Sequence, residues 1–544
     1  MATKFGDLVR ETRTRLGIGI RRFADEIGVD RSYVSAVETG KKPPSDDFIT
    51  RAAAALGFEI EALRTAAGRL PSDVMRVLED QPEELVAVVR EHFGTYGQGP
   101  PTTSQLALPD VALSPVSVAN VRPTVQIIKY MGSKREIIAF VADGIRSALP
   151  EGGTLLDVFA GTHSVGFALR QSHRIYATDI QEYSTAIGRA LLRSSASLPS
   201  PDELWAELEP HAHENQARLL EYVGDLVERE SDLLSTDEIT PGVMARYAEF
   251  QHQWPHIGNL AEANGDHPGP LFRKWIERRQ QDHRLAPYVL FAMYFACAYF
   301  SLAQCIWVDS IRYAIDRTFD PDDHLYWISL ASLLHACSYC TPGPGHFAQF
   351  RALNGSAGSQ DIMRYRNRSI RSYFREKYAE LSRHLTRPVY ENRAWTADYR
   401  EVLTPSVLRN VDGVYADPPY SFVHYSRFYH VLETLIRYDY PESEYYGRYR
   451  GDRHQSDFCI RTKVAGAFDD LARPVSAARL PLVISYSDTG MIKLDEIVAI
   501  CRDRYAPSGG SVDVCERDYL HCTMGRRGDK TRQVTEHLVV CHPS

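Results

Sequence analysis

Apolar residues recur every three or four positions through the first 70 residues, and this period predicts a succession of short helices. Gly28 ends the second helix, and Asp30 can cap a third that spans residues 31–38 and closes at Gly40. Residues 1–70 are therefore expected to form a small all-α domain. The apolar stripes are Phe5, Leu8, Val9 and Leu16, then Phe23, Ala24 and Ile27, then Phe48, Ile49, Ala52 and Leu56.

Two of these short helices, residues 23–27 and 31–38, are joined by a glycine-bearing turn, which is typical of a helix-turn-helix. The second helix of that motif enters the major groove of DNA. A bundle of this size also suits dimerisation or docking, an alternative that the pattern leaves open. The side chains that the second helix would present to DNA are Arg31, Ser32, Tyr33 and Ser35.

Two further segments separate this domain from the rest of the chain. Residues 71–95 continue as an amphipathic helical extension, and residues 96–123 are rich in Pro, Gly, Ser and Thr with few charges. The second composition predicts a flexible linker. We therefore expect the helix-turn-helix to be tethered to the following domain.

Beyond the linker, short apolar runs end at residues that can bind a ligand. Residues 154–158 are a predicted strand that leads into a tight turn at Gly161 and a helix beginning near Ser164. Glycine at such a turn lets the backbone approach a ligand closely. The next strand, residues 174–178, ends in Asp179, where Rossmann-like folds bind a ribose diol.

The tetrapeptide Asp417-Pro418-Pro419-Tyr420 follows another predicted strand, residues 414–416. That strand places the carboxylate at the carboxyl edge of a sheet, where open α/β folds bind ligands. The two prolines fix the backbone and remove two N–H donors, so the loop presents acceptors only. Rigid acceptors beside an aromatic ring suit a planar base with an exocyclic amine. The tetrapeptide alone is equally consistent with a proline-rich turn.

Composition bounds the number of domains and the compartment. At 544 residues the chain is too long for one core, and 44% hydrophobic with 24% charged residues is ordinary for a globular protein. No apolar stretch reaches bilayer length, and nine scattered Cys favour a reducing cytoplasm. Cys337 and Cys340 form one CxxC without a second pair at zinc spacing, so no metal is expected. The net charge of -8 restricts DNA contact to local patches.

Residues 196–387 form a long insertion, acidic and helical at first and then dense in apolar and aromatic residues. Such density at helical spacing more often marks a core than a ligand site. Residues 364–371 and 447–454 interleave arginine with tyrosine, which suits contacts to phosphates and bases, while a solvated helix face is the plainer alternative. The candidate DNA contacts are Arg364, Arg366, Arg368, Arg448 and Arg450.

Residues 23–40 resemble the Xre-type helix-turn-helix family of repressors and control proteins, and the similarity extends over about residues 5–70. Gly19 and Ile20 stand where that family usually carries a polar residue that contacts the DNA backbone. Arg21 and Arg22 are basic groups next to that position. The resemblance implies binding to double-stranded DNA, with sequence-specific reading left open.

Four motifs beyond the linker resemble the Dam-type (D12 class) DNA adenine-N6 methyltransferases, and they occur in that family's order with a long insertion before the last. They are Lys129-Tyr130-Met131-Gly132-Ser133-Lys134, the glycine turn within residues 157–166, Asp179, and the tetrapeptide 417–420. Residues 482–489 and 530–540 resemble the family's later strand and closing hairpin strand. His163 stands where the family usually has glycine, so its side chain would crowd the cofactor or hydrogen-bond it.

This resemblance implies an α/β, Rossmann-like fold that uses S-adenosylmethionine. Residues 124–195 and 388–544 would form the two parts of the core, and residues 196–387 a mostly helical target-recognition region. Asp417 and the Pro418 carbonyl would accept the two N–H bonds of a flipped adenine, beside Pro419, with Tyr420 stacked on the base. The residues implied to bind the cofactor are Tyr130, Lys134, Asp157, Phe159, Ala160, Gly161, Asp179 and Asp398.

The sequence therefore predicts a cytoplasmic, nucleoid-associated enzyme that methylates adenine N6 in double-stranded DNA, in a restriction-modification or phage-defence setting. A second copy bound through the helix-turn-helix, or other defence subunits, are the further candidate partners, and no membrane is expected. Two alternatives stay open. One is methylation of RNA or of a protein amide by a related loop. The other is a DNA-binding regulator or defence-complex subunit whose methyltransferase fold only senses the cofactor.

Overall fold

The structure is a computed structural model, and the chain divides into two compact units, Met1–Ser114 and Pro115–Ser544. The expected helical extension, residues 71–95, and the linker, residues 96–123, lie outside the described residues. The described residues are 2–15, 18–39, 42, 44–56, 125–132, 134–193, 197–236, 238–254, 281–343, 345–351, 353, 357–419, 424–444, 448–488, 490–522 and 531–544.

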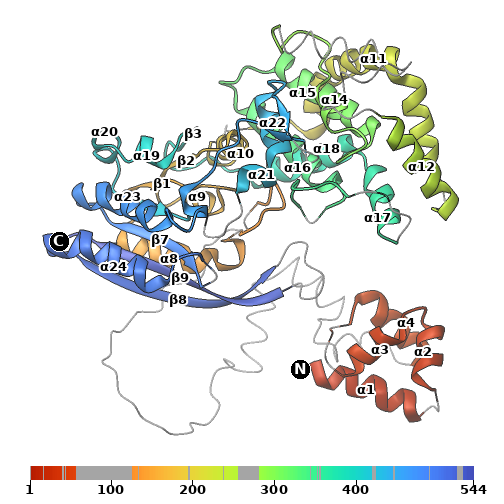
Figure 1. Cartoon of the computed structure of the whole chain (residues 1–544), viewed down its shortest axis with the longest axis horizontal. Helices are drawn as coiled ribbons and strands as arrows, with labels where there is room; N and C mark the ends of the chain where they lie inside the picture. Colours follow the sequence, from red (N-terminus) through yellow and green to blue (C-terminus); the bar gives the residue numbers. More distant parts are fainter. Residues whose placement is uncertain are drawn as a thin grey trace. The chain divides into compact units, whose positions relative to one another are not determined.

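The described part of the first unit is a helical bundle around the predicted helix-turn-helix (Figure 1). Asp30 caps the second helix of the motif, because its carboxylate accepts the backbone N–H of Ser32 at 2.6 Å. The core of the bundle contains the described residues of the predicted apolar stripes, among them Phe5, Phe23 and Phe48, whereas the side chains of Leu8 and Leu16 lie outside the described part. The helices are α1 (Ala2–Arg15), α2 (Ile20–Glu26), α3 (Arg31–Glu38) and α4 (Asp46–Leu56).

The second unit is built on a seven-stranded sheet with the strand order β3-β2-β1-β4-β7-β9-β8. The first five strands in that order run parallel, whereas β9 is antiparallel to both β7 and β8. A mostly parallel sheet with many helices agrees with the α/β methyltransferase fold that the resemblance implies. The strands are β1 (Thr154–Asp157), β2 (Arg174–Asp179), β3 (Arg393–Thr396), β4 (Gly413–Ala416), β7 (Leu482–Ser487), β8 (Ser511–Cys522) and β9 (Thr531–His542).

Helices cover both faces of this sheet, which is why the central strands β1, β4 and β7 are buried along their whole length and mostly apolar. One face packs on α8 (Ile138–Ala148) and α9 (Ser164–Leu169) through residues such as Leu155 and Tyr415. The other face packs on α23 (Val464–Ala477) and α24 (Leu494–Tyr505) through Leu156 and Val414. The smaller elements are η1 (Lys134–Ile137), α19 (Tyr399–Val402), α20 (Pro405–Leu408), β5 (Ser443–Glu444), β6 (Tyr449–Arg450), η3 (Asp457–Cys459) and η4 (Ala506–Ser508).

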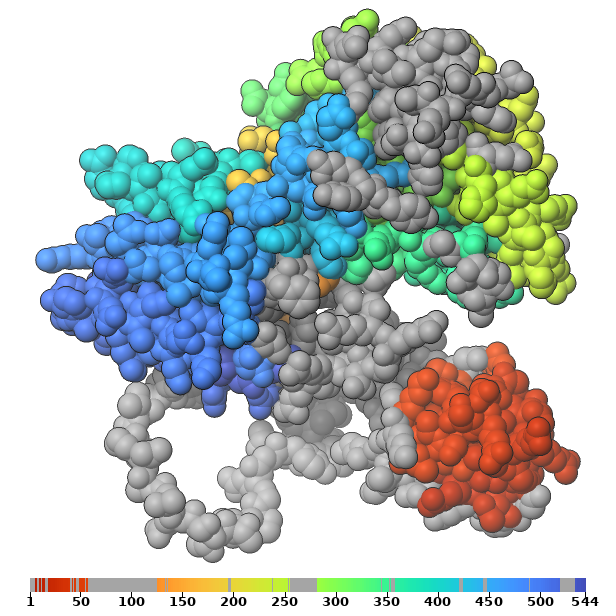
Figure 2. Space-filling model, in the orientation of Figure 1, coloured from red at the N-terminus to blue at the C-terminus, as the bar shows by residue number. Residues whose placement is uncertain are grey.

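The insertion is helical, and its aromatic and apolar stretch forms the largest core cluster together with α10. α16 is apolar on all sides and buried, which fits a helix at the centre of a core. Figure 2 shows the light-blue segment that follows the proline loop packed against the green helices of the insertion. None of the described helices is long and apolar enough to span a membrane. The described helices of the insertion are α11 (Pro201–Leu234), α12 (Pro241–Gln253), α14 (Leu290–Tyr294), α15 (Leu302–Thr318), α16 (His324–Cys340), α17 (Ala357–Arg366) and α18 (Ile370–His384). Outside the insertion, α10 (Glu182–Leu192) precedes it, and α21 (Tyr425–Phe428) and α22 (His430–Arg437) follow the proline loop.

Candidate active site

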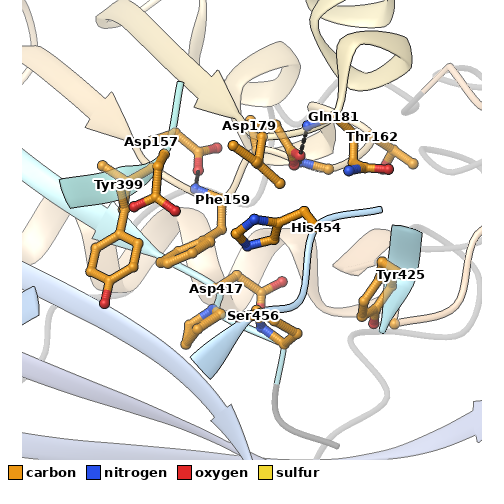
Figure 3. Close-up of a pocket in the computed structure, with 18 of the residues that line it drawn as sticks. Asp157, Phe159, Thr162, Asp179, Gln181, Tyr399, Asp417, Tyr425, His454 and Ser456 are labelled. Carbon is orange, nitrogen blue, oxygen red and sulfur yellow. Dashed lines mark hydrogen bonds between the residues drawn. The ribbon is translucent and has the colours of Figure 1, made fainter. Parts of the chain in front are cut away.

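One pocket opens at the carboxyl ends of β1, β2 and β4 (Figure 3). From β1 the chain continues to β2 and β3 on one side of the sheet, and from β4 it continues to β7 on the other side. The strand order therefore reverses between β1 and β4. Open α/β sheets bind their ligands at this kind of switch point. The pocket brings together most of the residues that the sequence proposed for the cofactor and the catalytic loop. These are Tyr130, Lys134, Asp157, Phe159, Ala160, Gly161, Asp179, Asp398, Asp417, Pro418 and Pro419, whereas Tyr420 lies outside the described residues.

Gly161 lies in the turn that follows β1 and lines the pocket. Its φ is +53°, and a Cβ there would lie 3.2 Å from the hydroxyl of Tyr130. The Tyr130 ring in turn packs against Tyr425 and Tyr429, with ring centroids 5.3 and 5.0 Å away, and those two rings also contact each other. A side chain at residue 161 would therefore meet both backbone strain and a fixed ring, and the turn keeps its backbone open to the pocket.

His163 adopts the left-handed conformation that favours glycine, with φ 58°. The expectation that its side chain crowds or bonds the cofactor is wrong. The ring is buried, it does not line the pocket, and its Nε2 donates to the Ser184 carbonyl at 2.8 Å. Burial lowers the pKa of His163 to about 4, so the imidazole is neutral at physiological pH.

Acidic side chains line the carboxyl edge of the sheet. Asp179 accepts the backbone N–H of Gly161 at 3.0 Å and that of Gln181 at 2.9 Å. Asp157 is buried and accepts the N–H of Phe159 at 3.3 Å. Burial raises the pKa of both carboxyl groups, and the N–H donors oppose that shift. The edge thus offers fixed acceptors for hydroxyl groups and negative charge for a cationic ligand.

Lys134 lines the pocket as expected, but its ammonium group is directed at two carboxylates. Its Nζ lies 3.0 Å from Asp417 Oδ1 and 2.7 Å from Glu536 Oε1. The lysine and Glu536 are buried, while the Asp417 side chain keeps 19% of its surface exposed. Burial raises the pKa of Asp417 to about 6, an effect that Lys134 opposes and Glu536 adds to.

Asp398 lies at the pocket wall and also begins α19. Its carboxylate accepts the backbone N–H of Arg400 at 2.9 Å, and the backbone N–H of Asp398 donates to the carboxylate of Glu401. This capping box fixes the turn that follows β3. Asp398 therefore has a structural role, as the cap of α19, in addition to lining the pocket.

Several pocket residues were missed by the sequence argument. Figure 3 shows the His454 ring inside the pocket, beside Phe159 and Asp417. His454 lies in the stretch that was interpreted as a DNA contact, and no spacing linked it to the glycine turn. His424 and Tyr425 follow the proline loop and also line the pocket. Glu536 was noted only as part of a closing strand, although an acid two residues before the apolar run 538–541 is itself a signal that it has a partner.

Three of the arginines proposed as DNA contacts are buried, and that expectation is wrong for them. Arg366 donates to the Ala298 carbonyl at 2.6 Å, and Arg448 donates to the Tyr294 and Ala296 carbonyls. Arg450 forms ion pairs with Asp439 at 2.7 Å and with Asp452 at 3.0 Å. Alternation of arginine with tyrosine therefore marks interior polar networks here, since guanidinium groups also serve as buried donors to carbonyls and carboxylates.

The other proposed DNA contacts have mixed surroundings. Arg364 is exposed on α17, whereas Arg368 is half-buried, donates to the Tyr339 carbonyl at 2.7 Å and stacks on Tyr365 at 3.7 Å. Tyr33 is half-buried as well: its ring packs edge-on against Phe48 and its hydroxyl accepts the backbone N–H of Ser45. Contact with DNA remains a prediction for the exposed residues Arg31, Ser32, Ser35 and Arg364, and for the half-buried Tyr33 and Arg368.

Comparison with known families matches both parts of the chain. Residues 4–67 match a helix-turn-helix domain family, and residues 130–229 match the D12 class N6 adenine-specific DNA methyltransferases. The chain contains a D12-class methyltransferase domain. The second match covers the glycine turn and the start of the insertion, and it ends before the proline loop.

Curated relatives of the D12-class domain are modification enzymes. The chain is 22% identical to the modification methylase LlaI of Lactococcus lactis over 417 residues, which is 75% of this chain and 54% of that protein. It is 32% identical to the type II methyltransferase M.FokI of Planomicrobium okeanokoites over 124 residues, 22% of this chain and 18% of that protein. The chain thus spans about half the length of the first relative and less of the second. No solved structure is significantly similar.

The helix-turn-helix has a relative of its own. An uncharacterized HTH-type transcriptional regulator of Mycobacterium tuberculosis is 36% identical over 73 residues, 13% of this chain and 52% of that protein. The two kinds of relative cover different parts of the chain, so the protein joins a helix-turn-helix to a D12-class domain.

Proposed function

We propose that the protein transfers a methyl group from S-adenosylmethionine to the N6 amine of adenine in double-stranded DNA. The observation that carries this proposal is the single pocket in which the Asp417-Pro418-Pro419 loop faces the Gly161 turn and Asp179. A nucleoside-binding edge and a rigid set of amine acceptors share one cavity. The D12-class domain and the modification methylases among the relatives support the same reaction.

The pocket residues fit the proposed cofactor. The open backbone at Gly161 leaves space that a Cβ would fill, and Asp179 offers carboxylate oxygens to ribose hydroxyls. The carboxylates of Asp157 and Asp398 at the same edge complement a cationic sulfonium ligand. When bound, S-adenosylmethionine would supply an electrophilic methyl group, so positioning matters more than a nucleophilic side chain.

The proline loop would act on the target amine. The lone pair of an adenine N6 is delocalised into the ring, which makes the amine a weak nucleophile. Asp417 and the Pro418 carbonyl would accept its two N–H bonds, which favours a pyramidal nitrogen and stabilises the positive charge that develops on it. The two prolines keep these acceptors fixed. Tyr420 is proposed to stack on the base.

DNA would be held by two regions of the chain. A base inside a duplex cannot reach the proline loop, so the target adenine would have to be flipped out of the helix. We assign target recognition to the insertion and additional affinity, or operator binding, to the exposed residues of α3. The names of the relatives, a modification methylase and a type II methyltransferase, support a restriction-modification setting for this proposal.

The test is methylation of unmethylated genomic DNA with methyl-labelled S-adenosylmethionine, using the wild type and the Asp417→Ala variant. We expect N6-methyladenine at a defined sequence with the wild type and none with the variant. Binding of S-adenosylhomocysteine, measured by calorimetry, should be similar for both proteins. Cofactor binding without label in any DNA would overturn the proposal. Label in RNA or protein would favour a related methyltransferase, and its absence from every substrate would favour a cofactor-sensing regulator.

A further inference from the structure

Glu536 is a buried acid in the middle of β9, just before the apolar run of residues 538–541. It lies on β9, opposite Ser487 of β7, and its side chain is fully buried. The strand residues that follow, such as Val539 and Val540, belong to the hydrophobic core. A buried carboxylate is costly unless charge and hydrogen bonds compensate it, so its partners indicate what it does.

Both described partners of Glu536 meet the same oxygen atom. Ser485 Oγ donates to Glu536 Oε1 at 2.5 Å, and Lys134 Nζ donates to it at 2.7 Å. The hydroxyl comes from β7, so two adjacent strands fix the position of that oxygen. The oxygen then holds the ammonium group of Lys134, and Nζ of that lysine lies 3.0 Å from Oδ1 of Asp417.

This arrangement places one cation between two carboxylates of unlike surroundings. Glu536 is sealed in the core, whereas Asp417 opens into the pocket at the carboxyl end of β4. A purely structural ion pair would be complete with Lys134 and either one of the acids. The shared lysine therefore couples a residue of the core to the residue that would accept the target amine.

We propose that Glu536 is a positioning residue for methyl transfer, which acts by holding the ammonium group of Lys134 at the carboxylate of Asp417. This inference rests on the proposed function, since it assigns Asp417 as the amine acceptor. Glu536 does not line the pocket and would touch neither the cofactor nor the base. It sets the orientation of Asp417 and the charge around it through one lysine.

The charged and titratable groups around Asp417 make this role measurable. Lys134 lies on η1, Glu536 on β9 and Asp157 at the end of β1, Tyr415 precedes the loop on β4, and His454 lies beside Asp417 in the pocket. Asp417 must be ionised to accept the amine, so the rate is lost as pH falls through its pKa. Removing the charge of Glu536 lowers that pKa, whereas removing the charge of Lys134 raises it.

The experiment compares steady-state methylation by the wild type, Glu536→Gln and Lys134→Met between pH 5 and 8. A third variant, Glu516→Gln, is the matched control, because it makes the same change on the adjacent strand β8 at an exposed position. We expect Glu536→Gln to lower kcat by about tenfold to a hundredfold, because the acceptor loses its fixed geometry. Binding of S-adenosylhomocysteine should stay close to that of the wild type.

The direction of the pH shift distinguishes positioning from damage to the fold. We expect the acid limb of the rate profile to move to lower pH in Glu536→Gln and to higher pH in Lys134→Met, with Glu516→Gln unchanged. If Glu536→Gln does not fold, Ser485→Ala replaces it in the test, because it removes one donor to the same oxygen. Its kcat should still fall below that of the wild type, by less than the loss expected for Glu536→Gln. A variant at residue 536 with wild-type kcat and pH profile would overturn the inference. A wild type that methylates no adenine-containing duplex would instead overturn the proposed function, and the inference with it.

Discussion

The imidazole of His163 fills the space beside Gly188 on α10. A Cβ at residue 188 would lie 2.6 Å from Nε2 of His163 and 2.7 Å from the Cβ of Ala394. The histidine ring therefore points away from the pocket and toward α10, the helix that follows β2. It meets that helix at Gly188, which has no side chain. The two positions are complementary, and together they allow a residue larger than glycine in the turn after β1.

This complementarity predicts the effect of Gly188→Ala. Alanine is the better helix former, yet the overlap with His163 and Ala394 should destabilise the protein by about 1–3 kcal/mol, as overpacking does in other cores. Binding of the cofactor should weaken too, because His163 is two residues from Gly161. Urea denaturation and calorimetry with S-adenosylhomocysteine measure the two effects.

The control for that substitution is Gly224→Ala on α11, where a Cβ would meet no atom within 4 Å. Without a clash, only helix propensity remains, and the change should stabilise the protein by up to about 1 kcal/mol. Equal effects of the two substitutions would show that the packing of His163 against Gly188 is unimportant.

The raised pKa of Asp417 predicts an acid limit on activity. Its carboxyl group has a pKa of about 6, so at pH 5 most of the population is protonated and cannot accept the target amine. We expect kcat to fall by about tenfold for each pH unit below that value, from simple titration of one group. Stopped-time methylation assays between pH 5 and 8 measure this, with binding of S-adenosylhomocysteine as the check that the pocket is intact. A rate that is flat across this range would contradict the prediction.

The sequence predicted the sheet and the pocket edge because their signals are local. Residues 154–158 and 414–416 are short apolar runs that end in Gly161 and Asp417, and both ends meet at one pocket. The contact between Glu536 on β9 and Lys134 on η1 joins residues 402 positions apart in the chain, so nothing near either residue revealed it.

The surface predictions were weaker for a related reason. Composition does not say which side of a segment is exposed, and Arg448 and Arg450 alternate with tyrosine in the interior of the domain. Buried donors and exposed phosphate contacts use the same guanidinium group. Arg364 and Arg366 are two residues apart on α17, yet one is exposed and the other is 2% exposed.

Substitutions at arginine separate these two environments. Arg450→Ala should destabilise the protein by about 1–3 kcal/mol, because it removes a buried guanidinium that donates to Asp439 and Asp452, while Arg437 still pairs with both carboxylates. Arg364→Ala should change stability by less than about 0.5 kcal/mol, as surface substitutions usually do. Chemical denaturation of both variants measures the difference, and similar losses would contradict the assignment.

The exposed arginine also has a predicted effect on DNA binding. If Arg364 contacts a phosphate, Arg364→Ala should weaken binding to all duplexes alike and reduce the slope of log K against log salt by about 1. Fluorescence anisotropy with a labelled duplex at several salt concentrations measures this slope. The exposed Arg383 near the end of α18 offers a comparison variant with the same loss of charge. A slope that is unchanged in Arg364→Ala would remove this residue from the DNA-binding surface.

Asp398 combines a cap and a pocket wall, and two substitutions can separate these tasks. Asparagine caps a helix about as well as aspartate, so Asp398→Asn should keep the stability of the wild type, whereas Asp398→Ala should lose about 1 kcal/mol. If the charge of Asp398 contributes to binding of the sulfonium, both variants should bind S-adenosylmethionine more weakly than the wild type. Thermal denaturation gives the first comparison and calorimetry the second. Full binding by Asp398→Asn together with weak binding by Asp398→Ala would instead show that the residue acts on the pocket only through the turn that it caps.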